Sequence, residues 1–342
     1  MSLTQKREVY KPFEYPKAFE YFEKQQQAHW LPTEVSMAGD INDWKTSLNE
    51  VERSVVGNVL KGFTQAEIHV EDYWSRKVAK WFVKPEVCMM ANTFAGMEAI
   101  HIWGYSYLND SLGLDDYAAF LKDDATVAKL DRLKNTKAIK TSKEEIARSL
   151  AVFSAFTEGV HLFSSFAILL NFSRFNKLKG VGQIVTWSIR DESLHSEAGC
   201  WLFREYCKEN PGVREAVEED IYEAARLTVK LEDDFIDMCF KSPTGDTSVD
   251  KMFNLGVEGL DKDDLKQYIR YRTNTKLQDL GYSSNWKNID KDAIKRMEWF
   301  DALSAGVEFQ DFFAQRVTTY SKGVSSNWNI DYVFGDENAK DN

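Results

Sequence analysis

The chain of 342 residues combines a hydrophobic content of 43% with a formal net charge of −11. This length and composition allow a sizeable core in one large domain, and the acidic balance argues against a nucleic-acid partner, which would favour a basic surface. No apolar run approaches the roughly 18 residues of a membrane helix, the first residues lack an apolar signal stretch, and the four cysteines form no CxxC pair. We therefore expect a cytoplasmic protein with reduced thiols that binds neither nucleic acid nor a membrane.

Apolar residues recur at helical spacing along most of the chain, and the long middle contains few prolines that would break a helix. The first predicted helical stretch runs from about Trp44 to Lys80, and the second from Pro85 to Asn109. Further stretches are predicted over residues 142–174, 181–208, 213–241 and 262–321, the last with a break near Gly281. Because no alternating pattern is long enough for a substantial sheet, the predicted fold class is all-α.

The character of the sequence changes after Tyr320. Residues 321–326 are typical of a turn, and the last residues are mostly polar and acidic after an aromatic start at Tyr332. Such a composition favours a mobile segment over a packed one. The sequence therefore predicts one helical domain over residues 1–322 and a flexible C-terminal tail over residues 323–342.

Four of the predicted helices each place one glutamate on a face that is otherwise apolar. These residues are Glu67, Glu98, Glu158 and Glu192. A buried, unpaired carboxylate is costly, and four of them close together would repel one another strongly. Two divalent or trivalent cations would remove that repulsion, so the pattern favours a site that binds two metal ions.

Two of these glutamates belong to Glu-x-x-His motifs. Glu98 and His101, like Glu192 and His195, are three residues apart, so both side chains of each motif can reach one metal. Ferritin-like carboxylate proteins combine two such motifs with a single Glu from each of two other helices. A lone Glu on an apolar face usually reaches solvent at its edge, and a lone His is usually a hydrogen-bonded core residue. Their joint occurrence at this spacing favours metal binding.

A third Glu-x-x-His motif joins Glu158 to His161. The two-metal pattern needs only two histidines, so His161 is surplus to it. We interpret His161 as a core residue or as a residue that supports a ligand, with direct metal binding as the alternative.

Two segments resemble a known family. Residues 94–101, FAGMEAIH, followed one turn later by Tyr105, resemble the radical-site helix of class I ribonucleotide reductase small subunits. Residues 190–195, RDESLH, resemble the RDExLH signature of the same family. The resemblance extends from about Trp30 to the tail and implies a ferritin-like helical bundle that forms a homodimer. It also implies six ligands of a dinuclear metal centre, namely Glu67, Glu98, His101, Glu158, Glu192 and His195.

In the resembled family, the metal pair reacts with an oxygen species and is left as a strong one-electron oxidant. That oxidant produces a thiyl radical on a separate large subunit, which reduces ribonucleotides to deoxyribonucleotides. The resemblance therefore implies that this chain is an oxidoreductase subunit, and that its tail docks to the large subunit.

The resemblance also assigns residues to the transfer of the oxidising equivalent. Trp30 and Asp191 would lie on the transfer path, with Asp191 hydrogen-bonded to a ligand histidine. Tyr105 would lie beside the metals. Tyr332 would be the last relay before the large subunit, with Tyr320 as the alternative. For each aromatic residue, plain core packing is the competing interpretation.

Two positions bear on the identity of the metal. Glu67 stands where many tyrosyl-radical members of the family carry Asp, and a Glu there resembles the manganese-using branches. The manganese–iron branch usually lacks a Tyr at the position of Tyr105, whereas a dimanganese branch keeps one. The combination favours an Mn/Mn centre. Fe/Fe and Mn/Fe centres stay as alternatives, because both metals accept carboxylate and imidazole ligands.

Other functions compete with this interpretation. A ligand-binding oxidase similar to the reductase would have the same bundle and metals, but it would not need Tyr332 or a docking tail. A ferritin-type iron store has a much shorter chain and forms cages. A purely structural bundle would bind no metal.

Overall fold

The computed structural model describes residues 2–114, 116, 118, 124–135, 142–240 and 257–304. Within these ranges the regular elements are helices, and the β pairing is limited to an isolated bridge between Val257 and Leu260. The all-α prediction is therefore confirmed. The predicted tail, and with it the domain boundary after residue 322, lies outside the described residues.

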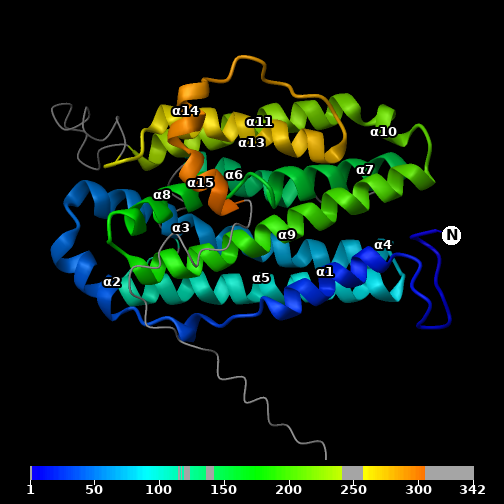
Figure 1. Ribbon diagram of the computed structural model, residues 1–342, viewed down its shortest axis with the longest axis horizontal. Coiled ribbons are helices and arrows are strands. Elements are labelled where there is room, and N and C mark those ends of the chain that lie inside the picture. The colour runs from blue at the N-terminus through cyan, green and yellow to red at the C-terminus, as the bar shows by residue number, and fades with distance from the viewer. Residues whose placement is uncertain are drawn as a thin grey trace, which may run out of the picture. The chain divides into compact units, whose positions relative to one another are not determined.

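Long helices form the framework of the bundle. They are α1 (Pro16–Gln27), α3 (Glu50–Tyr73), α5 (Pro85–Leu112), α9 (Lys179–Glu209), α11 (Glu218–Cys239) and α13 (Lys262–Leu280). The shorter elements are η1 (Pro32–Glu34), α2 (Ala38–Asn42), η2 (Asp43–Ser47), η3 (Trp74–Val78), α4 (Ala79–Trp81), α6 (Asp124–Asn135), α7 (Lys143–Ala151), η5 (Val152–Thr157), α8 (Phe163–Arg174), α10 (Val213–Ala216), α14 (Lys291–Arg296) and α15 (Glu298–Ser304). In Figure 1, α5 packs against α1 and α3, α9 against α7 and α8, and α11 against α13. Contacts of α9 with both α5 and α13 join these groups.

The start of α3 is set by its own sequence. Asn49 accepts a hydrogen bond from the Glu52 amide at 2.9 Å, and the Glu52 carboxylate accepts one from the Asn49 amide at 2.9 Å. This reciprocal capping satisfies two amides that have no partner inside the helix. The stretch predicted from Trp44 to Lys80 is therefore divided, because η2 ends before α3 begins and η3 follows it.

The stretch predicted over residues 142–174 is also not one helix. α7 passes into the π-helical turn η5, the chain then forms irregular turns over residues 158–162, and α8 begins at Phe163. The Glu158 amide donates to the Phe153 carbonyl at 3.0 Å, and the His161 amide donates to the Phe156 carbonyl at 2.9 Å. Both bonds span five residues instead of four, a feature that is frequent at functional sites. Apolar periodicity alone does not reveal this break.

Two aspartates near α2 hold the start of α9. Asp40, which is 2% exposed, accepts hydrogen bonds from the Gly180 and Val181 amides at 2.9 and 2.8 Å. Asp43 accepts one from the Leu178 amide at 3.0 Å. Burial raises the pKa of Asp40, although the two amide bonds act in the opposite direction. These contacts fix where α9 begins, and therefore which of its residues face the interior.

The segment before α1 is anchored on the start of α5. The Arg7 guanidinium donates to the two Glu86 oxygens at 3.0 and 2.7 Å, and the Glu14 and Tyr15 amides donate to Glu86 Oε1 at 2.9 and 3.0 Å. Burial raises the pKa of Glu86, but Arg7 and the backbone amides lower it by more, so it lies below 4.5. The ionised carboxylate is thus the form that ties the two segments together.

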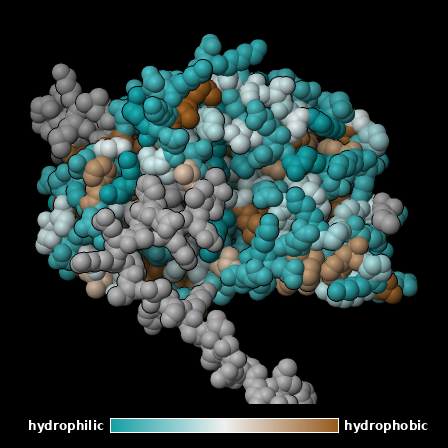
Figure 2. Space-filling model, viewed as in Figure 1, coloured by the Kyte–Doolittle hydropathy of each residue, from teal (hydrophilic) through white to brown (hydrophobic). Residues whose placement is uncertain are grey.

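Most of the visible surface is hydrophilic, with separate apolar spots, as Figure 2 shows. The large apolar side chains that are exposed among the described residues are Val9, Tyr10, Ile68, Trp103, Phe175 and Leu227. None of the helices in the described ranges has the length and apolar character needed to cross a membrane.

Candidate metal centre

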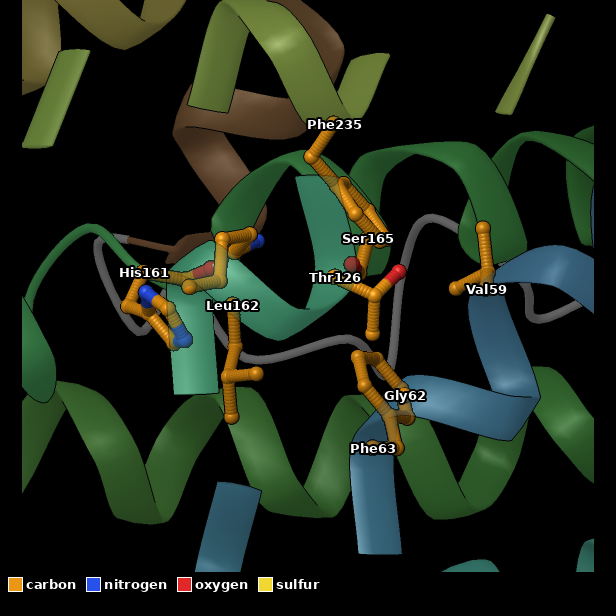
Figure 3. A pocket seen from close by; sticks show the side chains of 9 residues that line it. Val59, Gly62, Phe63, Thr126, His161, Leu162, Ser165 and Phe235 are labelled. Atoms are coloured by element: carbon orange, nitrogen blue, oxygen red, sulfur yellow. The ribbon is translucent and has the colours of Figure 1, made fainter. Parts of the chain in front are cut away.

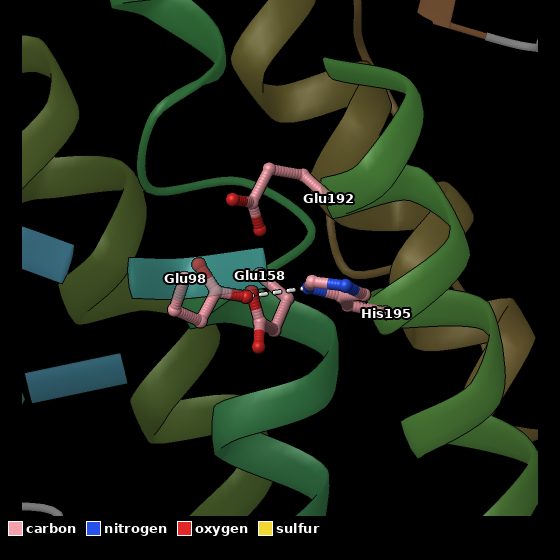
Figure 4. A group of neighbouring side chains, drawn as sticks. All are labelled: Glu98, Glu158, Glu192 and His195. Carbon is pink, nitrogen blue, oxygen red and sulfur yellow. Dashed lines mark ion pairs between the residues drawn. The ribbon is translucent and has the colours of Figure 1, made fainter. Parts of the chain in front are cut away.

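Four buried side chains from three parts of the chain meet in the interior. Glu98 comes from α5, Glu158 follows η5, and Glu192 and His195 come from α9. One ligand atom of each lies within 4.8 Å of the others, and the side chains point toward one another in Figure 4. His195 Nδ1 is 2.6 Å from Glu98 Oε1. Such an arrangement of carboxylates and imidazole is one that manganese and iron accept.

His101 is next to this group. Its Nδ1 lies 3.0 Å from Glu98 Oε2 and 3.0 Å from Glu192 Oε1. Glu67 lies on α3, which packs against α5, but its side chain is outside the described residues. The structure thus brings five of the six predicted ligands together and leaves the position of the sixth carboxylate unassigned.

Three carboxylates and two histidines share this buried cluster. Burial raises the pKa of Glu98, but the charges of His195 and His101 lower it by more, to about 2. Burial and the charges of Glu192 and Glu98 instead hold the pKa of Glu158 well above 4.5. Glu158 Oε2 is also buried without a hydrogen-bond partner among the described residues. A cation at this place would satisfy that oxygen and remove the repulsion, so the residues fit a metal site.

Hydrogen bonds set which nitrogen of each histidine faces the carboxylates. Asp191 accepts from His101 Nε2 at 3.3 Å and from Gln25 Nε2 at 3.1 Å. An ionised carboxylate only accepts hydrogen bonds, so the NH₂ group of the Gln25 side chain must face Asp191. The Gln25 side-chain oxygen Oε1 then faces His195 Nε2 at 3.1 Å. The Nε2 atoms of His101 and His195 therefore donate, and their Nδ1 atoms face the glutamates of the cluster. Partners of this kind fix the tautomer and orientation of metal-binding histidines.

Two residues of the site were missed in the sequence. Gln25 is buried on α1, a helix that the sequence pattern did not predict, although Ala18, Tyr21 and Gln25 share its buried face. Trp74 donates its indole N–H to Glu158 Oε1 at 2.5 Å. Nothing in the local sequence around Trp74 indicates which acceptor it meets. Both residues bind groups that are more than 80 positions away in the chain.

Trp30, Asp191 and His101 contact one another. The Trp30 indole N–H donates to Asp191 Oδ2 at 2.7 Å, and the Trp30 ring stacks on the His101 ring with centroids 5.9 Å apart. A Cβ atom at Gly104 would lie 3.2 Å from the Trp30 ring, so a larger residue there would press on the indole. Tyr105 is fully buried, with its ring 6.1 Å from that of His101.

The remaining predicted residues lie elsewhere. His161 is buried with Nδ1 3.7 Å from Glu232 Oε1, and it does not belong to the four-residue group. Its role, as a core residue, a support of a ligand or a ligand, stays a prediction. Tyr320 and Tyr332 lie outside the described residues, so their roles stay predictions.

The chain resembles reductase small subunits over almost its whole length. The family model described as ribonucleotide reductase, small chain, matches residues 7–292. A probable ribonucleoside-diphosphate reductase small subunit of Invertebrate iridescent virus 6 is 36% identical, over 96% of this chain and 99% of its own. The ribonucleoside-diphosphate reductase subunit beta of Chlamydia pneumoniae is 27% identical, over 93% of this chain and 91% of its own. These relatives do not favour the ligand-binding oxidase alternative.

Solved structures show the same fold. A putative class I ribonucleotide reductase from Bacillus halodurans superposes with a TM-score of 0.73 at 18% identity, over 83% of this chain and 99% of its own. The dimanganese(II)-NrdF of Streptococcus sanguinis superposes with a TM-score of 0.68 at 20% identity, over 86% and 99%. The predicted ferritin-like bundle is confirmed. The chain therefore belongs to the family of ribonucleotide reductase small chains, oxidoreductase subunits in which a dinuclear metal centre starts the radical reduction of ribonucleotides.

Proposed function

We propose that the dinuclear metal centre of this small subunit is held by Glu67, Glu98, His101, Glu158, Glu192 and His195. The observation that carries the proposal is the buried convergence of four of these side chains, with ligand atoms within 4.8 Å of one another. When bound, the centre supplies a one-electron oxidant for the large subunit. Because bound metal displaces protons from the carboxylates and histidines, its affinity should fall as the pH is lowered.

We propose an Mn/Mn centre, with support from the sequence combination of Glu67 and Tyr105. The test is deoxyribonucleotide formation with the cognate large subunit, after the small subunit is loaded with Mn alone, Fe alone, or both. Activity with Mn alone would support the proposal. Activity only with Fe, or only with the mixture, would keep the function and overturn the metal assignment. No activity with any loading, despite complex formation, would contradict the function itself.

We propose Trp30 as the relay that carries the oxidising equivalent away from the site. Its indole N–H already donates to Asp191 Oδ2 at 2.7 Å, so loss of an electron from Trp30 can be balanced by movement of that proton toward the carboxylate. Trp30→Phe should therefore leave metal binding intact and abolish deoxyribonucleotide formation. A variant that retains the wild-type rate would remove Trp30 from the path.

We propose that Tyr105 does not store the oxidising equivalent in the Mn/Mn form. Tyr105→Phe should then retain substantial activity, since Tyr105 is buried against Phe63 with ring centroids 4.6 Å apart and a phenyl ring fits the same space. Near-total loss of activity in a correctly metallated variant would show that the phenol is required.

A reductase small chain acts with a large subunit, and we propose that the tail of this chain is the docking element, with Tyr332 as the last relay and Tyr320 as the alternative. Deletion of residues 331–342 should abolish activity and leave metal binding unchanged. Full activity of the truncated chain would contradict this assignment. The predicted cytoplasmic location likewise stays a prediction.

We further propose a homodimer that forms through the outer face of α5. The exposed residues Asn92, Gly96, Ala99 and Trp103 make a face without charge, and Trp103 is 43% exposed. Uncharged aromatic surface of this kind is enriched at interfaces. Trp103→Glu should give a monomer in sedimentation velocity, whereas Phe175→Glu, at an exposed site on another part of the chain, should not. A wild-type chain that sediments as a monomer would refute the proposal.

A further inference from the structure

The turn that carries Glu158 is held by two buried cations. Outside helical geometry, the Gly159 carbonyl accepts a hydrogen bond from Arg272 Nε, and the His161 carbonyl accepts one from Lys129 Nζ at 3.0 Å. Arg272 is 7% exposed and Lys129 is 5% exposed. Buried carbonyls that leave the helical ladder need such donors. The backbone position of residues 158–162 therefore depends on side chains from α13 and α6.

The turn has no free space on its α9 side. A Cβ atom at Gly159 would overlap the Ala155 carbonyl oxygen and come within 2.7 Å of Ser196 Oγ on α9. Only glycine allows this close approach without displacement of its neighbours. A Cβ there would also lie 2.8 Å from Lys276 Cδ on α13, so the turn is closely packed against both helices.

The turn also borders a small cavity. A cavity of about 20 Å³ is bordered by Lys129, His161, Thr126 and Ser165, and Figure 3 shows His161, Thr126 and Ser165 around it. This volume is about that of one water molecule. Lys129 and His161 both border this space, so the Lys129 hydrogen bond holds the turn at its edge.

Lys129 is itself held by a buried carboxylate. Its Nζ lies 2.7 Å from Glu232 Oε1 and 3.8 Å from the centre of the Phe235 ring. Ser164 Oγ donates to the other Glu232 oxygen at 2.5 Å. A buried ion pair contributes little net stability, because desolvation offsets the attraction, but it holds its two partners in one geometry. The Lys129–Glu232 pair is therefore better suited to holding neighbouring groups in place than to raising the free energy of unfolding.

We propose that Lys129 and Glu232 are positioning residues for Glu158. By holding the His161 carbonyl, the pair fixes the turn and thereby the place of the Glu158 carboxylate beside Glu98 and Glu192. The inference rests on the proposed metal centre, which needs Glu158 in that place. Neither Lys129 nor Glu232 belongs to the four-residue group itself.

The test compares Mn²⁺ binding by the full chain and by Lys129→Met, which keeps the length of the side chain and removes its charge. Binding is followed by the electron paramagnetic resonance signal of Mn²⁺, alongside thermal unfolding. The expected result is an affinity about tenfold lower and an altered spectrum of the bound ions, the effect typical of residues that support a ligand. Lys129→Arg should restore both.

Lys84→Met is the matched control. Lys84 is 3% exposed and pairs with Glu14 at 2.8 Å at the start of α5, so it tests the loss of a buried Lys pair away from Glu158. This variant should lose stability and keep the wild-type affinity and spectrum. Wild-type affinity and spectrum in Lys129→Met, or equal loss in both variants, would overturn the positioning role.

A milder variant keeps the proposal testable if Lys129→Met does not fold. Ser164→Ala removes one hydrogen bond to Glu232 without deleting a buried charge, and it should give a smaller change of the same kind.

The two proposals fail in different ways. A wild-type chain that binds fewer than two ions of either Mn²⁺ or Fe²⁺ would reject the metal centre, and the positioning role with it. Two ions bound equally well by the wild type and all variants would reject only the positioning role.

Discussion

Gln25→Leu is the substitution that most directly tests how the site is organised. The Gln25 amide joins two groups that no other described residue joins in this way: it donates to Asp191 Oδ1 at 3.1 Å and accepts from His195 Nε2 at 3.1 Å. Leucine has a similar volume but supplies neither a donor nor an acceptor. The variant therefore leaves a buried carboxylate and a buried imidazole each short of one partner.

The expected size follows from these two contacts. Asp191 Oδ1 keeps the Arg190 guanidinium at 3.4 Å, whereas His195 Nε2 loses its described partner. An unsatisfied buried polar group costs about 1–3 kcal/mol, so the free energy of unfolding should fall by roughly 1–3 kcal/mol. His195 also loses the partner that keeps its proton on Nε2, and loss of such a partner typically lowers metal affinity about 10- to 100-fold. Gln25→Glu should bind metal poorly as well, because it places a second carboxylate beside Asp191.

The assay combines urea unfolding with an Mn²⁺ titration of the full chain. Gln26→Leu is the control, since Gln26 is exposed and bonds only to Thr93 Oγ1 at 3.3 Å among the contacts described. It should change stability by less than about 0.5 kcal/mol. Metal affinity and stability in Gln25→Leu that match those of Gln26→Leu would refute the reasoning.

Three other substitutions test contacts of the framework. Glu86→Gln should lower the melting temperature at pH 7. Because the pKa of folded Glu86 lies below 4.5, its contribution is present above that pH and is lost as the pH falls through the folded value, so wild-type and variant curves from circular dichroism should converge in acid; parallel curves would contradict this. Asp40→Ala should cost about 1–3 kcal/mol in urea unfolding, because two α9 amides lose a buried acceptor; no change would mean that solvent replaces it. Gly159→Ala should cost about 1–3 kcal/mol because the new methyl group overlaps the Ala155 carbonyl oxygen, whereas Gly39→Ala, with open space around it, should not destabilise the chain; equal losses would contradict the packing argument.

Much of the bundle could be predicted because helical periodicity is a local property. α5 was predicted from Pro85 to Asn109 and extends to Leu112, and α9 was predicted over residues 181–208 and runs from Lys179 to Glu209. Both helices carry continuous apolar faces, so the helical spacing predicts each of them as one unbroken element. α1 was missed, and the long stretch over residues 142–174 was read as one helix although η5 and the turn after it divide it.

Part of the candidate site could likewise be predicted from local spacing, and part could not. The i, i+3 spacing places Glu98 with His101, and Glu192 with His195, on single faces of unbroken helices, and the structure has these faces meet. The chemistry of buried carboxylates then favours a metal site before any tertiary contact is known. Glu158 is different, because a π-helical turn precedes it and two cations distant in the sequence donate to carbonyls of the turn that carries it.

The all-α class, the two Glu-x-x-His faces and the family resemblance can be predicted from the amino-acid order alone, because each depends on residue types a few positions apart. Four contacts of the site became visible in the folded chain: Gln25 bonds both Asp191 and His195, Trp74 donates to Glu158, and Lys129 donates to the turn beside it. Gln25 and Asp191 are 166 positions apart, and Trp74 and Glu158 are 84 apart. No local pattern encodes such pairs, since the partner of a buried polar group is chosen by packing of whole helices against one another.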